Sequence, residues 1–347
     1  MLPTNASGIV TTIAGSGQDG FSGASGKAID LPISQPFGLC IGPDGQLYVC
    51  SVGSHVVYRI NIETGDMTIV AGCGRKGYSG DGGPAIAAEL NEPYEVRFDK
   101  SGNLYFVEMQ NHLVRKVDMT TGLISTLAGT GTQGFDGDGG PAVQGLMNRP
   151  HSIAFDAAGN LYICDIGNHR IRRVDMTNGI ISTFAGTGER QPTPDGAPIS
   201  GTPLDGPRAL DFDGHGAFYL ALREGNAIFR INLMAGTLHH LAGTGKSGYE
   251  GDGGPAKNAV LAGPKGIAFD STGDLYFADT ESHTIRVIRR ESGVIETVIG
   301  DGVQGNGPPG AARQCRLDRP HGVFVSTDGV LYIGDSNNHQ VRRLKLR

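Results

Sequence analysis

Six prolines recur along the chain at an almost constant spacing, and this spacing restricts the fold more than any other feature. The prolines are separated by 57, 57, 57, 57 and 56 residues and are Pro36, Pro93, Pro150, Pro207, Pro264 and Pro320. Each begins the same pattern: a short apolar run, a turn, a Leu-Tyr-apolar run, a polar hinge that often ends in His, and a segment with alternating basic residues. A fixed long period is the signature of a repeat protein. We therefore expect one array of six units, although 347 residues alone would suggest two domains.

Each copy of the repeat predicts four short strands. In the third copy, Asp, Asn and Gly turns separate β-branched and aromatic runs, which are His151–Asp156, Leu161–Asp165, Arg170–Asp175 and Ile180–Ala185. A four-stranded antiparallel unit leaves faces and edges uncovered, so the copies must stack, and radial stacking of such units makes a β-propeller. The sequence therefore predicts an all-β fold, a six-bladed β-propeller that spans residues 1–347 as one domain.

The two ends of the chain are expected to close the ring. The last copy, residues 320–347, contains only three predicted strands. The segment 9–17, IVTTIAGSG, repeats the outer-strand pattern IISTFAGTG of the third copy. We therefore expect the N-terminal strand to complete blade six, which removes the open ends of a linear array.

Three motifs in the third copy, PHSIAFD, GNLYICD and GNHRI, resemble those of the NHL repeat family. The resemblance covers nearly the whole chain and implies a six-bladed propeller of NHL repeats. It implies less about function, because such propellers serve as enzymes, sensors and binding platforms. A more distant similarity connects the chain with amidating-lyase and gluconolactonase-like propellers.

Composition argues against several function classes. The formal net charge of −6 argues against nucleic acid as a partner, because phosphate binding needs a concentrated basic face. No apolar run approaches the roughly 18 residues that span a membrane. Five cysteines without a CxxC pair fit reduced thiols. No basic and apolar leader opens the sequence, so we expect a cytoplasmic location, and we expect a monomer.

The residue after each repeat proline is expected to face the central channel, where propellers carry their functional sites. This ring is Phe37, Tyr94, His151, Arg208, Lys265 and His321. One residue further on, Glu95 replaces the small residues of the other copies. A second ring ends the second strand of each copy, where Asp is the usual residue. Ser51, Glu108 and Leu222 depart from it, and Arg223 follows Leu222.

These residue types favour an enzyme that acts at the mouth of the channel on a small, anionic substrate, by lyase or hydrolase chemistry. The candidate catalytic residues, which supply acid and base groups, are His151, His321, Tyr94 and Glu95. The candidate substrate-binding residues, most of them cationic or aromatic, are Arg208, Arg223, Lys265, Phe37 and Glu108.

The resemblance to amidating lyases also implies a metal. In those lyases the zinc-ligand histidines follow this proline, in a Pro-His-Ser or Pro-His-Gly setting that His151 and His321 match. We therefore consider one divalent metal, zinc or calcium, in the central channel with these two histidines as ligands. The lyases use three histidines, and the other ring positions here are Phe, Tyr, Arg and Lys, so the three-histidine site is absent.

Two alternatives to an enzyme stay open. In the first, the position after the proline simply varies among NHL repeats and carries no site. In the second, the propeller is a non-catalytic platform for a protein, a peptide or a glycan. The aromatic residues on the inserts that would form such a docking rim are Phe21, Tyr78, Phe135 and Tyr249.

Other recurring polar residues are expected to be structural. The loop histidines that belong to the repeat are His55, His112, His169, His283 and His339. Insert aspartates that precede Pro-Ala are expected to cap a short helix, with a calcium site as the alternative, and are Asp81, Asp138 and Asp252. The basic residues of the third strands are expected either to face solvent or to pair with a neighbouring Asp.

Overall fold

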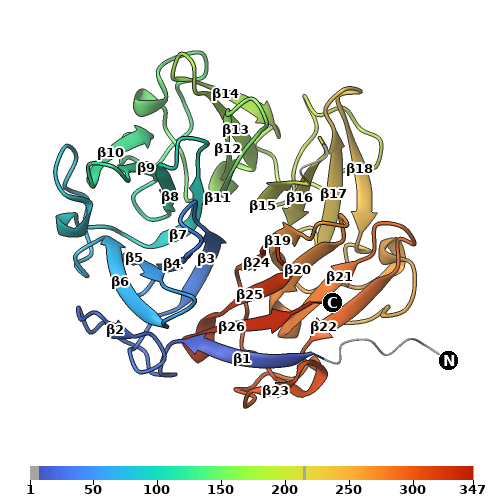
Figure 1. Ribbon diagram of the computed structural model, residues 1–347. Helices are drawn as coiled ribbons and strands as arrows, with labels where there is room; N and C mark the ends of the chain where they lie inside the picture. Colours follow the sequence, from blue (N-terminus) through green and yellow to red (C-terminus); the bar gives the residue numbers. More distant parts are fainter. Residues whose placement is uncertain (1–7, 214–215, 347) are drawn as a thin grey trace.

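The computed structural model describes residues 8–213 and 216–346. Six β-sheets are arranged radially around a central channel (Figure 1). The innermost strands contact one another in chain order and the last contacts the first, so the ring is closed. The predicted six-bladed β-propeller is confirmed. No helix within the described residues is long and apolar enough to cross a membrane.

The strands of each blade run antiparallel from the channel outward. Blade one contains β3 (Pro36–Ile41), β4 (Leu47–Ser51), β5 (Val56–Ile60), β6 (Asp66–Ala71) and the short β2 (Gly26–Lys27). Blade two contains β7 (Pro93–Phe98), β8 (Leu104–Glu108), β9 (Leu113–Asp118) and β10 (Leu123–Ala128). Blade three contains β11 (Pro150–Phe155), β12 (Leu161–Asp165), β13 (Arg170–Asp175) and β14 (Ile180–Ala185).

The second half of the chain repeats this order. Blade four contains β15 (Pro207–Phe212), β16 (Phe218–Leu222), β17 (Ala227–Asn232) and β18 (Thr237–Ala242). Blade five contains β19 (Pro264–Phe269), β20 (Leu275–Asp279), β21 (Thr284–Ile288) and β22 (Ile295–Ile299). Blade six contains β24 (Val323–Val325), β25 (Val330–Asp335), β26 (Gln340–Lys345), β1 (Ile9–Ala14) and the short β23 (Gly310–Ala311).

Short 3₁₀ helices occupy two recurring places. Those in the inserts between blades are η1 (Ala85–Ala87), η2 (Ala142–Gln144), η4 (Ala256–Asn258) and η6 (Ala312–Gln314). Those that follow the second strand are η3 (Ile166–Asn168), η5 (Thr280–Ser282) and η7 (Ser336–Asn338).

The N-terminal strand closes the ring as predicted. β1 pairs antiparallel with β26, with Val10 opposite Leu344 and Thr12 opposite Arg342. Arg342 Nη1 donates a hydrogen bond of 2.6 Å to Thr12 Oγ1 across this junction. The two ends of the chain are therefore held in one sheet, and the ring opens only if this pairing breaks.

The apolar core lies between the blades, because each sheet is covered on both faces by its neighbours. Every residue of β8, from Leu104 to Glu108, is therefore buried. Tyr48 and Cys50 of blade one pack in a single cluster with Val96 and Phe106 of blade two. This packing explains why the second strands are continuous apolar runs, without the alternation of a half-exposed strand.

Four blades bury an arginine of the third strand completely, namely Arg115, Arg172, Arg286 and Arg342. In blade two, Arg115 Nη1 lies 2.6 Å from Glu108 Oε1, and its Nη2 lies 2.6 Å from Asp81 Oδ1 of the insert. Exclusion of water strengthens such a pair and makes the loss of either partner costly. Of our two expectations for third-strand basic residues, pairing with a neighbouring carboxylate is confirmed at these positions and exposure is wrong.

The insert aspartates bind these arginines and cap no helix. The pairs are Asp81 with Arg115 at 2.6 Å, Asp138 with Arg172 at 2.7 Å and Asp252 with Arg286 at 2.9 Å. Within the described chain, η1, η2 and η4 receive no side-chain cap, so the predicted capping role is wrong. The calcium alternative also fails to fit, because a guanidinium already occupies the place of the cation.

Blades one and four replace both partners of the buried ion pair together. Ser51 and Tyr58 stand at the two positions in blade one, and Leu222 and Phe229 stand there in blade four. A buried charge without its partner costs several kcal/mol. The joint replacement therefore keeps these two blades free of an unpaired charge.

The loop histidines connect neighbouring blades. His112 adopts a left-handed backbone conformation with φ of 56°, and its Nδ1 accepts a 3.0 Å hydrogen bond from the backbone N–H of Arg149. The equivalent bonds join His55 to Glu92, His283 to Arg319 and His339 to Gln35. A structural role is thus confirmed for four of the five histidines. Nδ1 of the fifth, His169, has no hydrogen-bond partner among the described residues.

Because of this difference, we expect alanine substitutions at His112 and at His169 to lower the free energy of unfolding by unequal amounts. His112→Ala removes the acceptor of the Arg149 N–H and should lower the free energy of unfolding by about 1 kcal/mol more than His169→Ala does. Both positions have positive φ, so the strain of alanine there is common to the two variants. Urea denaturation measures the difference, and equal losses would contradict the proposed connection between blades.

Candidate functional site

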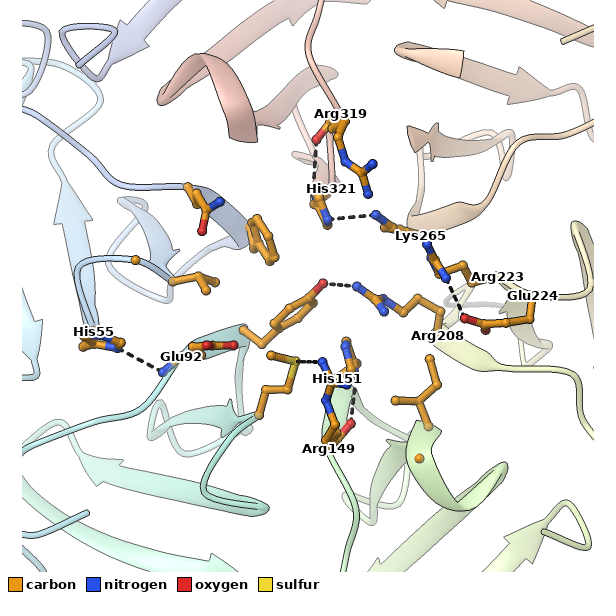
Figure 2. A pocket seen from close by; sticks show the side chains of 18 of the residues that line it. His55, Glu92, Arg149, His151, Arg208, Arg223, Glu224, Lys265, Arg319 and His321 are labelled. Carbon is orange, nitrogen blue, oxygen red and sulfur yellow. Dashed lines mark hydrogen bonds and ion pairs between the residues drawn. The ribbon is translucent and has the colours of Figure 1, made fainter. Parts of the chain in front are cut away.

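A cavity of about 740 Å³ opens at one mouth of the central channel. Its lining is strongly basic (Figure 2). Among the described residues, the basic members of the lining are Lys76, Arg149, Arg190, Arg208, Arg223, Lys265 and Arg319. The acidic members are Glu92 and Glu224. In a chain whose net charge is −6, this cavity concentrates positive charge.

The ring of residues after the repeat prolines forms the floor of the cavity. Phe37 stacks on His321 with ring centroids 3.8 Å apart. Tyr94 meets Phe37 and His151 edge to face, with centroids 4.6 Å and 4.5 Å away. Below this aromatic cluster lies a void of only about 20 Å³, which has room for about one water molecule. A ligand can therefore enter from the mouth but cannot pass through the floor.

The two ring histidines are neutral, with one tautomer favoured. His151 Nδ1 lies 2.6 Å from the carbonyl oxygen of Arg149, and His321 Nδ1 lies 2.8 Å from that of Arg319. A carbonyl only accepts hydrogen bonds, so each Nδ1 carries the hydrogen and each Nε2 keeps a lone pair. Burial, and then the nearby cations, holds the pKa of both histidines well below the usual range.

Arginine and lysine side chains surround one side of the floor. Arg208 donates a hydrogen bond to the hydroxyl of Tyr94 and lies over its ring. Lys265 Nζ lies 2.9 Å from His321 Nε2. Burial, reinforced by the charge of Arg208, lowers the pKa of Lys265 to about 6. The amine is thus largely neutral near pH 7.

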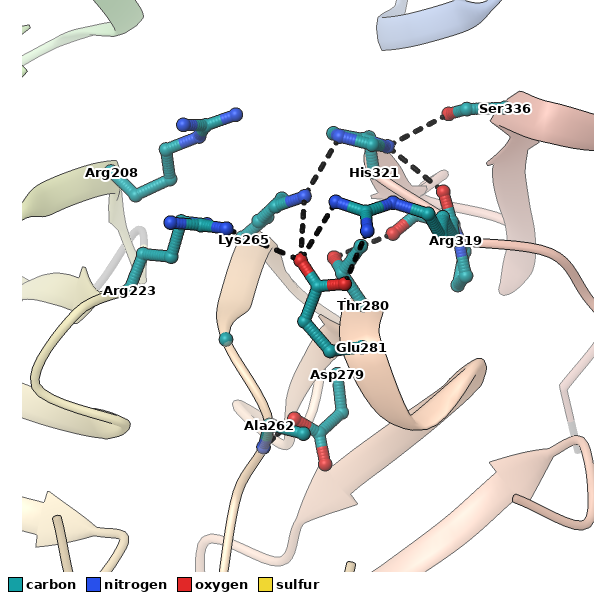
Figure 3. Close-up of polar contacts among 12 residues, drawn as sticks. Arg208, Arg223, Ala262, Lys265, Asp279, Thr280, Glu281, Arg319, His321 and Ser336 are labelled. Atoms are coloured by element: carbon teal, nitrogen blue, oxygen red, sulfur yellow. Dashed lines mark hydrogen bonds and ion pairs between the residues drawn. The ribbon is translucent and has the colours of Figure 1, made fainter. Parts of the chain in front are cut away.

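One carboxylate, that of Glu281, lies within ion-pair distance of several cations (Figure 3). It lies 2.6 Å from Arg319, 3.3 Å from Arg223 and 3.5 Å from Lys265. Arg223 also pairs with Glu224 at 2.7 Å. Even with Lys265 neutral, Arg208, Arg223 and Arg319 outnumber the two carboxylates of Glu281 and Glu224, so the cluster keeps an excess of positive charge.

The structure brings most of the predicted site residues together. Those that line the cavity are Phe37, Tyr94, His151, Arg208, Arg223, Lys265 and His321. Glu95 lies below the floor, where it lines the small void and pairs with Arg97 at 2.5 Å. Burial raises the pKa of the Glu95 carboxyl. It does not reach the cavity, so its predicted catalytic role is not supported.

Glu108 was predicted to bind substrate, and this prediction is wrong. Its side chain is fully buried within blade two, where it pairs with Arg115 at 2.6 Å. Its other oxygen, Oε2, accepts a 2.7 Å hydrogen bond from the backbone N–H of Asn91. Glu108 is therefore the longer equivalent of the aspartates that anchor the other blades, such as Asp165, which accepts from the N–H of Asn148.

Sequence reasoning missed Glu281 and the residues that precede the repeat prolines. Arg149 and Arg319 occupy that preceding position and line the cavity. The same comparison between copies would have found them, since blades one, two, four and five carry Gln35, Glu92, Gly206 and Gly263 there. Glu281 lies two residues after the end of β20, at a position that was not compared between copies.

The donor set at the ring does not fit the predicted divalent metal. His151 and His321 are its only imidazoles, and Nε2 of His321 accepts from Lys265. Arg208 would repel a cation at this point, and so would Lys265 whenever it is protonated. Within the described residues, no group of three His, Cys, Asp or Glu side chains is arranged to hold a metal ion. We therefore derive no chemical step through a metal.

The family comparisons agree with the repeat architecture. The NHL repeat model matches residues 147–174 and 317–344, and the teneurin NHL domain model matches residues 231–309. Human NHL repeat-containing protein 2 is 27% identical over 70% of this chain. Protein SUPPRESSOR OF QUENCHING 1, chloroplastic, of Arabidopsis thaliana is 29% identical over 75% of it. The chain spans only 37% and 25% of the length of these two relatives.

Solved structures share the fold at low sequence identity. An auxiliary nutrient binding protein of Bacteroides thetaiotaomicron has a TM-score of 0.71 and 17% identity, covering 97% of this chain and 76% of the other. A gluconolactonase of Xanthomonas campestris has a TM-score of 0.63 and 12% identity, with coverages of 100% and 94%. Virginiamycin B lyase of Staphylococcus aureus has a TM-score of 0.57 and 14% identity, with coverages of 97% and 99%. With its six repeats and its closed ring, the chain is a six-bladed β-propeller, and it matches the NHL repeat model in its third and sixth blades.

Proposed function

We propose that this propeller binds a small organic anion in the basic cavity and acts on it by acid–base chemistry of the lyase or hydrolase type. The observation that carries the proposal is the lining itself, in which seven basic side chains face two carboxylates among the described residues. The volume of about 740 Å³ lies within the range of small-molecule sites, roughly 300–1,000 Å³. A large partner would not fit below the mouth.

Arg208 and Arg223 are suited to hold the anion. A guanidinium presents a planar set of donors that matches a carboxylate or a phosphate, and it keeps its charge at any physiological pH. Both side chains line the cavity, on the side of its floor that carries Lys265 (Figure 3).

The floor supplies groups for proton transfer. His151 and His321 are neutral and each keeps an unprotonated Nε2, which suits a general base. Burial raises the pKa of the Tyr94 hydroxyl, so it keeps its proton and can serve as a general acid. Because Arg208 donates to the Tyr94 oxygen, it would also stabilise the phenolate after the proton is given up.

Binding without turnover is the second candidate function. It is favoured because the reactive groups are engaged with one another, Tyr94 with Arg208 and His321 with Lys265. The docking platform for a macromolecule has less support. Of the aromatic residues predicted as its rim, Phe21, Tyr78 and Phe135 are exposed, but neither they nor Tyr249 line the basic cavity.

The remaining parts of the proposal concern the oligomeric state, the cellular location and the partners of the protein. We propose that it works as a monomer in the cytoplasm, on a small molecule and without nucleic acid or membrane as partner. Size-exclusion chromatography with light scattering tests the monomer, and fractionation of the source cells tests the location.

Thermal unfolding with a panel of small molecules tests anion binding. Carboxylates and phosphates such as pyruvate, citrate and phosphate should raise the unfolding temperature, whereas malonamide and glycerol should not. A ligand at a hundred times its Kd stabilises the folded state by about 2.7 kcal/mol. The shift should disappear in Arg208→Gln/Arg223→Gln and persist in Arg230→Gln, which alters an exposed arginine outside the cavity lining. Equal shifts in both variants would place the binding elsewhere.

A further inference from the structure

Lys265 is the buried lysine of the cavity floor. It is the second residue of β19, and only 4% of its side chain is exposed. The side chain lines both the cavity and the void below it. Its Nζ lies 2.9 Å from His321 Nε2 and 3.5 Å from Glu281 Oε1. The amine therefore has one neutral neighbour and one distant carboxylate.

The surrounding charges favour the neutral form of this amine. Glu281 is closer to Arg319 and Arg223, at 2.6 Å and 3.3 Å, than to Lys265. Neither guanidinium can give up its proton under physiological conditions. The lysine is the one cation of this group that can relieve the excess charge, and it does so by losing a proton. The pKa of about 6 agrees with this charge balance.

The hydrogen bond to His321 fixes the direction in which the amine donates. Nδ1 of His321 donates to the carbonyl oxygen of Arg319, so its Nε2 is an acceptor and the Lys265 amine is the donor. A neutral amine that donates one N–H keeps its lone pair free for another atom. Neutral, desolvated lysines near other cations are the form in which lysine acts as a nucleophile.

We propose that Lys265 forms an imine with the carbonyl carbon of a small 2-oxo acid whose carboxylate is held by Arg208 and Arg223. Both arginines lie beside Lys265 (Figure 3). This inference rests on the proposed function, because it needs the anion to bind in the cavity, and it names the class of substrate.

The chemistry balances without an oxidant or a metal. The Nζ lone pair forms a bond to the carbonyl carbon, and the carbonyl π electrons move to the oxygen, which takes a proton. The proton lost from Nζ passes to His321 Nε2. It then leaves with the hydroxyl group as water when the C=N bond forms. The carbonyl oxygen takes its first proton from solvent, so the sum is one amine, one oxo acid and one proton giving one protonated imine and one water. The protonated imine withdraws electrons from the neighbouring carbon, which is the activation that lyases need.

Borohydride trapping tests the imine. The full-length protein is incubated with pyruvate and sodium borohydride, which reduces an imine to a stable secondary amine. Intact mass and peptide mapping should then show one reduced pyruvyl group, on Lys265. The adduct should be lost in Lys265→Arg and in Lys265→Met, and it should persist in Lys246→Arg, which alters an exposed lysine outside the cavity lining. Acetone, which lacks the carboxylate, should give much less adduct.

Thermal unfolding of the same samples separates this inference from the proposed function. If pyruvate stabilises the wild-type protein but leaves no adduct on Lys265, the nucleophile is overturned and anion binding stands. If pyruvate neither stabilises nor modifies the protein, and the other anions also have no effect, both are overturned. An adduct spread evenly over surface lysines would likewise contradict the assignment to Lys265.

Discussion

Replacing Arg172 with Met is expected to lower the free energy of unfolding by about 3–5 kcal/mol. The reason is that Arg172 is fully buried and lies 3.6 Å from the equally buried Asp165. Without the guanidinium, that carboxylate is left in a dry interior with no opposite charge. Denaturant unfolding, followed by circular dichroism, measures the loss.

Blade four supplies the compensated version of this variant. Leu222 and Phe229 occupy there the positions of Asp165 and Arg172. The double variant Asp165→Leu/Arg172→Phe should therefore recover much of the stability that Arg172→Met loses. A double variant as unstable as the single one would show that the other contacts of the two residues, Arg172 with Asp138 and Asp165 with the N–H of Asn148, carry the stability.

Replacing Lys265 with Met is expected to stabilise the protein, by on the order of a few kcal/mol below pH 6. Burial and Arg208 lower the pKa of this amine from 10.5 to about 6 in the folded state. Between these two pH values the unfolded chain binds a proton that the folded chain does not. The lysine therefore costs more stability as the pH falls toward 6, and the cost is constant below that. The charged and titratable groups around Lys265 are Arg208, Arg223, Arg319, Glu281 and His321.

Urea denaturation at several pH values tests this expectation. The gain from Lys265→Met should be largest near pH 5.5 and should shrink as the pH rises toward 10. Lys76→Met serves as the control, because that lysine is exposed at the edge of the same cavity. A gain that is independent of pH would mean that Lys265 keeps its proton in the folded protein, and the imine inference would lose its support.

The sequence predicted the fold well because the repeat period is a property of the chain itself. The spacing of the prolines and the extra strand at residues 9–17 required a closed ring of six blades, and the structure has both. The partners of the polar residues could not be predicted in the same way. In the sequence, the alternation of the third-strand arginines is typical of exposed charges. In the structure, the neighbouring blade covers these arginines. The sequence position of Asp81 suggests a helix cap, but in the folded insert its carboxylate pairs with Arg115.

Part of the candidate site could be predicted because the repeat places the same position of every blade at the channel. The residue after each proline reaches the channel in every blade, so comparison of the copies found Arg208, Lys265 and the two histidines. The role of Glu108 was predicted wrongly because a residue that differs from the usual residue of the repeat can keep the structural role of that position. Here a longer carboxylate side chain pairs with the equivalent buried arginine. The metal was expected from the two histidines and from the resemblance to amidating lyases. The sequence placed Lys265 and Arg208 in the same ring, but only the structure shows that Lys265 contacts His321 Nε2 and that Arg208 contacts the Tyr94 hydroxyl.

The central claim, that the basic cavity is an anion site, is tested most directly by calorimetric titration. The anion with the largest thermal shift is titrated into the wild-type protein, Arg208→Gln/Arg223→Gln and Arg230→Gln. A hydrogen bond to a charged group contributes about 1.5–3 kcal/mol, so the loss of two guanidiniums should weaken binding at least about tenfold. Arg230→Gln should bind like the wild type. Equal affinity in all three proteins would contradict the claim that this cavity holds the anion.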